Sequence, residues 1–98
     1  MIYHAVLLKL KLNTSAGKVD EIFRELAGLK GLIPGLLSFS GGPYSSGEGL
    51  NKGFTHGFLM TFSDAASRDA YLPHPEHERV KAIIVPNLDD VVAFDWEG

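Results

Sequence analysis

Alternation of side chains along the first residues of the chain predicts a β-strand. Residues 2–12 are apolar at every even position except His4, whereas lysines occupy odd positions in the second half of this stretch. A period of two residues is that of a strand. The first half is apolar on both faces, which is typical of a strand buried from both sides. The same alternation, with phenylalanine at both ends, predicts a strand over residues 54–62.

Helical spacing of apolar residues marks the other large segments. Residues 16–30 carry apolar side chains three and four positions apart, after capping residues at 13–15 and before Gly31, which predicts a helix. A second helix begins after Ser63 or Asp64. It is broken at the Pro-His-Pro run, where Pro75 starts a further helix that extends to about Ile84. The remaining elements are strands over 36–40 and 91–96 and a Gly/Ser-rich loop over 41–53.

The order strand–helix–strand–strand–helix–strand predicts one α+β domain over residues 1–98, with a ferredoxin-like βαββαβ sheet. Right-handed connections would place the helices on one face. We expect the first and third strands to lie side by side at the centre, in parallel. The other face, which holds Tyr3, Ala5, Leu7 and Leu59, is left open and partly apolar. A second copy of the sheet is the simplest cover, which predicts a homodimer with two-fold symmetry.

Composition narrows the classes of function. The chain has 98 residues, a net charge of −3 and no cysteine. Disulfides, thiolate catalysis and cysteine-bound metal centres are therefore excluded, and a cytoplasmic location is favoured. Lysine and arginine are scattered, whereas nucleic acids require a concentrated basic face. No apolar run reaches the roughly 18 residues of a membrane span, so we expect neither nucleic acid nor membrane as a partner.

Four histidines and one tyrosine are candidates for a pocket on the helix-covered face. Because we expect the central strands to be parallel neighbours, His4 and His56 should lie at the same end of the sheet. The helical segment after the third strand would return to that end with Tyr71, His74 and His77. We therefore predict that His77 and Tyr71 form a catalytic pair. The ligand-binding residues would be His4, His56 and His74.

The expected roles follow from local position. A helix that begins at Pro75 makes His74 its N-cap and His77 its third residue. A helix N-terminus disfavours a positive imidazole, so His77 would suit the role of a general base. Tyr71 could donate a hydrogen bond to a developing oxyanion. Each residue also has a structural explanation, which is core packing for the strand histidines and Tyr71 and capping for His74.

Two other kinds of site have weaker support. Four histidines could bind zinc, nickel or iron, but the His-Pro-Glu-His run at 74–77 lacks the i, i+4 spacing of helical zinc motifs. We therefore predict no metal and no cofactor. The glycine-rich stretch 41–49 lacks the lysine of a P-loop and leads into a strand. We interpret it as a mobile hairpin loop that could close over the pocket.

The sequence resembles the stress-responsive A/B barrel family over nearly its whole length. The most specific motif is the Tyr-x-x-His-Pro-x-His run over 71–77, and the other segments are 3–11, 33–35, 53–58 and 91–96. The resemblance implies a ferredoxin-like protomer that pairs into a dimeric barrel. One plant member of the family closes a polyketide ring by aldol condensation. Its catalytic tyrosine and histidine match Tyr71 and His77, and its strand histidines match His4 and His56.

Four functions are compatible with these patterns. The main prediction is a dimeric protein of unassigned activity that binds a small apolar, carbonyl-bearing ligand in the His/Tyr pocket. The alternative is a cofactor-independent polyketide cyclase-like enzyme, in which His77 is the base, Tyr71 stabilises the enolate, and His4 and His56 orient them. A structural dimer without a ligand is the third. A haem-associated oxygenase, the fourth, is supported by the histidines alone.

Overall fold

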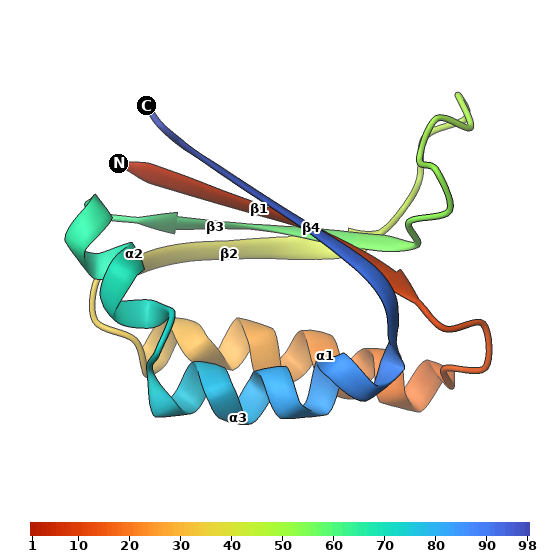
Figure 1. The fold of residues 1–98 in the computed structure, drawn as a ribbon, viewed down its shortest axis with the longest axis horizontal. Helices are drawn as coiled ribbons and strands as arrows, with labels where there is room; N and C mark the ends of the chain where they lie inside the picture. Colours follow the sequence, from red (N-terminus) through yellow and green to blue (C-terminus); the bar gives the residue numbers. More distant parts are fainter.

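In the computed structural model, which describes residues 1–98, helices lie on one side of a four-stranded sheet (Figure 1). The strands are β1 (Ile2–Leu10), β2 (Leu36–Pro43), β3 (His56–Phe62) and β4 (Leu88–Glu97). The helices are α1 (Ala16–Gly28), α2 (Ala65–Tyr71) and α3 (Pro75–Ile84), with 3₁₀ turns at Leu29–Gly31 and Val85–Asn87. This arrangement confirms the predicted ferredoxin-like α+β fold.

The direction of the central strands differs from the prediction. The sheet order is β2-β3-β1-β4, and β3 is antiparallel to both β1 and β2. The predicted parallel pairing of β1 with β3 is therefore wrong. The right-handed crossover through α1 relates β1 to β2, which are parallel, and β3 lies between them in the opposite direction. As a result His4 pairs with Met60, whereas His56 pairs with Leu8 at the other end of β1.

Local capping positions the helices as the sequence predicts. Ser15 caps α1 by accepting a hydrogen bond from the Lys18 N–H at 3.1 Å. Asp64 caps α2 by accepting from the Ser67 N–H at 2.8 Å. The sequence reasoning was less accurate at strand ends, since β2 continues to Pro43 and β4 begins three residues earlier than predicted, at Leu88. None of the helices combines the length and the apolarity needed to cross a membrane.

The core lies between the helices and the covered face of the sheet. Even-numbered residues of β1, together with Phe58, Met60 and Phe62 of β3, are buried there against Ile22 and Leu26 of α1. Burial of such side chains supplies most of the driving force for folding.

The open face of the sheet keeps large apolar side chains in solvent. Leu7 is 46% exposed, and on the adjacent strand Phe94 is 66% exposed and Trp96 45%. Trp96 stacks on Tyr3 with ring centroids 5.2 Å apart. The open face is therefore apolar, as predicted. The loop 44–55 projects beyond it at one end (Figure 1).

Candidate functional site

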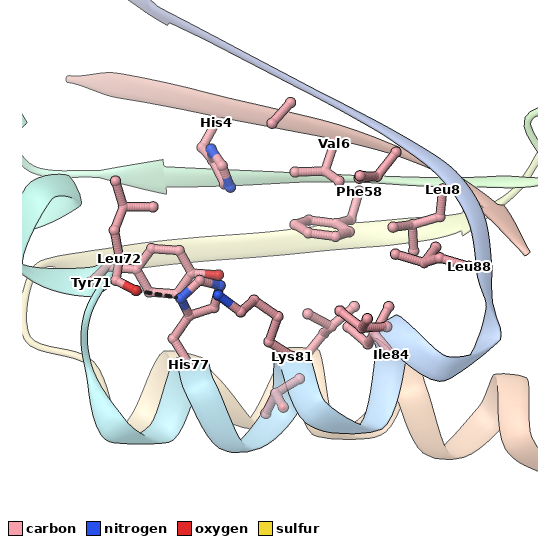
Figure 2. A pocket seen from close by; sticks show the side chains of 15 residues that line it. His4, Val6, Leu8, Phe58, Tyr71, Leu72, His77, Lys81, Ile84 and Leu88 are labelled. Carbon is pink, nitrogen blue, oxygen red and sulfur yellow. Dashed lines mark hydrogen bonds between the residues drawn. The ribbon is translucent and has the colours of Figure 1, made fainter.

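A cavity of about 250 Å³ lies between α3 and the covered face of the sheet, next to the edge strand β4 (Figure 2). Twelve of its fifteen lining residues are hydrophobic. The lining is divided along the length of α3. Tyr71 and His77 lie at the end where α3 begins, together with His4, whereas Leu8 and Ile84 lie at the far end (Figure 2). The cavity thus has a polar end and an apolar end.

His4 is held at the polar end by two charged residues. Its Nδ1 atom lies 2.6 Å from Asp95 Oδ1, and Arg68 donates to the other carboxylate oxygen at 2.7 Å. Burial would raise the pKa of Asp95, but the hydrogen bonds from His4 and Arg68 outweigh it and lower that pKa below its ordinary value. Because an ionised carboxylate only accepts, Nδ1 of His4 carries a proton. In the neutral ring, Nε2 is then a free acceptor.

His77 is the third residue of α3, as predicted. Its Nδ1 atom lies 2.9 Å from the carbonyl oxygen of Leu72 (Figure 2). A carbonyl oxygen only accepts, so Nδ1 donates and carries the proton. The neutral ring therefore keeps the Nε2 lone pair free, which is the form that can accept a proton.

Tyr71 lies directly beside His77. Its side chain is 1% exposed, and its ring centroid is 4.2 Å from that of His77 and 5.9 Å from that of His4. Burial, and then the negative charge of Asp95, raise the pKa of Tyr71, so its hydroxyl stays protonated at neutral pH. No hydrogen bond joins that hydroxyl to the other residues that line the cavity (Figure 2). Tyr71 is therefore a free donor at the polar end.

His56 lies away from this cavity. Its Nδ1 atom is 2.8 Å from Thr55 Oγ1, and its ring contacts Phe23 with centroids 5.5 Å apart. Burial lowers the pKa of His56. The predicted convergence of His56 with His4 is wrong because the strands that carry them are antiparallel. His56 instead lines a separate cavity with Leu7 and Tyr44, where the loop 44–55 leaves the sheet.

His74 is the N-cap of α3, as predicted, and its Nδ1 accepts a hydrogen bond from the Glu76 N–H at 3.0 Å. It does not line the cavity. The structure therefore gives His74 a capping role, and its predicted role in ligand binding stays a prediction.

Sequence reasoning missed two groups at the site. Lys81 lines the cavity one helical turn after His77, and the i, i+4 spacing could have identified it. Asp95 lies opposite His4 on β4, and this pairing becomes visible only once the register of the two strands is known. No three His, Cys, Asp or Glu side chains are grouped so that they could hold a metal ion.

Residues 2–98 match the family model described as "Stress responsive A/B Barrel Domain". The stress-response A/B barrel domain-containing protein HS1 of Arabidopsis thaliana is 31% identical, over 98% of this chain and 88% of its own length. Olivetolic acid cyclase of Cannabis sativa is 25% identical, over 97% of this chain and 94% of its own. A dimeric ferredoxin-like protein of unknown function from Jannaschia sp. CCS1 is 33% identical with a TM-score of 0.87, over 99% of this chain and 98% of its own.

Proposed function

The chain belongs to the stress-responsive A/B barrel family, and we propose that it binds a small apolar, carbonyl-bearing molecule between α3 and the sheet. The observation that carries this proposal is the division of the cavity. Tyr71, His4 and His77 offer hydrogen bonds at one end, and the remaining wall is almost entirely apolar. Apolar cavities with a few placed polar groups are typical of small-molecule sites. A volume of about 250 Å³ favours a ligand smaller than most drug molecules.

We also propose a catalytic alternative, which is the enolisation of a carbonyl compound without a cofactor, followed by aldol-type ring closure. In this mechanism Nε2 of His77 takes a proton from the carbon next to the carbonyl. The Tyr71 hydroxyl then stabilises the enolate oxygen, and His4 orients the carbonyl. The enolate carbon adds to a second carbonyl carbon of the same molecule, whose C=O π bond opens to an alkoxide, and the alkoxide takes the proton back from His77. The specific support is the tautomer of His77, which the Leu72 carbonyl fixes, beside a Tyr71 hydroxyl that has no hydrogen bond to the cavity wall (Figure 2). The relative named olivetolic acid cyclase makes a cyclase-like reaction a reasonable choice.

One experiment tests both proposals. Alkyl ketones and a panel of β-polyketo compounds are added to the protein in D₂O, and NMR follows binding and deuterium exchange at the carbon next to the carbonyl. His77→Gln should remove the exchange. His74→Asn is the matched control, because it keeps a capping acceptor outside the cavity. Binding without faster exchange would exclude the enzyme, and the absence of any binding would exclude both proposals.

We propose, in addition, that the protein is a homodimer through the open face of the sheet. The exposed side chains of Leu7, Val92, Phe94 and Trp96 support this, since a small protein seldom leaves such a patch uncovered. The Jannaschia relative is described as dimeric. Two sheets packed face to face would give the dimeric α+β barrel expected from the sequence. We also propose a cytoplasmic location, as predicted from the absence of cysteine.

A further inference from the structure

Lys81 gives the cavity a positive charge. It lies one helical turn after His77 on α3, and both residues line the cavity. Its side chain extends from the helix toward the polar end, where Tyr71 and His77 are found (Figure 2). Apart from the two histidines, Lys81 is the only lining residue that can carry a charge.

The ammonium group of Lys81 is available to a ligand. Its partner is Glu78, at 3.2 Å, and both side chains are 51% exposed. Such an exposed ion pair is worth little, because water screens it and both side chains lose freedom in forming it. The nearby carboxylate of Asp95 is already bound by His4 and Arg68 and does not line the cavity. No carboxylate of the cavity wall therefore competes for Lys81 or repels an anion.

We propose that Lys81 makes this cavity selective for acids, so that the ligand carries a carboxylate on an apolar body. This inference rests on the proposed function, since it names the class of ligand for the same cavity. One carboxylate oxygen would accept from the Lys81 ammonium group and the other from the Tyr71 hydroxyl. The apolar body would then lie along Leu8, Ile84 and Leu88 at the far end. A ligand seated there excludes water, which strengthens the charge interaction.

The test compares octanoate with octanamide, which have the same chain and nearly the same shape but differ in charge. Both are titrated into ¹⁵N-labelled protein at neutral pH. We expect octanoate to bind about three- to fivefold more tightly, as for a partly exposed ion pair. Lys81→Gln should remove this difference without changing the affinity for octanamide. Glu78→Gln should raise the affinity for octanoate only, since it frees the ammonium group.

Lys30→Gln is the matched control, because it removes the same charge from an exposed residue that does not line the cavity. An equal loss of octanoate affinity in both lysine variants would overturn the proposal in favour of the overall charge. Lys81 also lies in the last turn of α3, where a cation stabilises a helix. A purely structural role would lower the melting temperature of Lys81→Gln and leave the octanoate-to-octanamide ratio unchanged, which also overturns the proposal. If octanoate and octanamide bind equally to the unmodified protein, the proposed selectivity for acids is overturned, but the proposed binding function is not. If neither compound binds, the proposed function is overturned as well.

Discussion

Replacement of Tyr71 by phenylalanine separates the hydroxyl group from the ring that carries it. The ring is 1% exposed and packs on Phe62, with centroids 5.1 Å apart, and on His4. The hydroxyl has no hydrogen bond to the other residues of the cavity wall (Figure 2). A buried tyrosine usually finds such a partner, so an unpaired hydroxyl beside a cavity is the feature under test.

The structure fixes the expected size of the effect. A hydrogen bond within the protein contributes about 0.5–1.5 kcal/mol to stability, and the Tyr71 hydroxyl has none to lose. Tyr71→Phe should therefore change the free energy of unfolding by less than about 0.5 kcal/mol. Tyr71→Ala, which removes the buried ring, should cost about 3–5 kcal/mol. Ligand affinity should fall about two- to tenfold in Tyr71→Phe, since one hydrogen bond to the ligand is lost.

Urea unfolding at one fixed protein concentration measures the stability of both variants, because the apparent stability of a dimer depends on concentration. Titration with octanoate measures the affinity of the folded protein. A loss of stability above about 2 kcal/mol in Tyr71→Phe would mean that the hydroxyl has a structural partner. An unchanged ligand affinity would mean that the ligand does not reach Tyr71. Either result refutes the role assigned to this hydroxyl.

Three further changes test the dimer, the His4 support and the helix cap. Leu7→Glu should weaken the dimer by about 2–4 kcal/mol, because it places an unpaired charge in the interface. The mass measured by light scattering should then approach the 10.7 kDa of one chain. Leu12→Glu, at a fully exposed position, is the control and should leave the dimer intact. The lowered pKa of Asp95 means that its contribution to stability is present above the ordinary value of 3.8 and is lost as the pH falls through the folded-state pKa. Asp95→Asn should flatten the acid limb of a stability–pH profile, and identical profiles would contradict this. His74→Ala should lower the free energy of unfolding, measured with urea, by about 1 kcal/mol, and His74→Asn should recover most of that loss. A changed ligand affinity in either variant would show that His74 reaches the site.

The elements could be predicted from the sequence because their signals are local. The period of two in β1 and the caps at Ser15, Asp64 and His74 each depend on a few neighbouring residues. The direction of β3 relative to β1 is not local. Alternation is the same for a strand in either direction, so the direction has to come from the connections between strands. The predicted order already determined that direction, because a crossover makes β1 and β2 parallel and a hairpin makes β3 antiparallel to β2. The error therefore lay in applying the topology and not in the fold class.

The same distinction explains which site residues were found together. Tyr71 is the last residue of α2 and His77 is the third residue of α3. The two are close along the chain, so their proximity does not depend on the sheet. The placement of His56 depended on strand direction, and it was wrong. Asp95 supports His4 only through the register of β4 on β1. A single sequence contains no direct record of that register.

The strand β4 takes part in both the cavity and the open face. Val91 and Ala93 line the cavity, whereas Val92 and Phe94 are exposed with the open face. This division follows from the alternation of side chains along a strand. Because β4 is an edge strand that pairs only with β1, a partner packed on its outer face would also order the inner face. Leu7 does not line the cavity, so a loss of ligand affinity in a monomeric Leu7 variant would report on the order of β4 and not on a lost contact with the ligand.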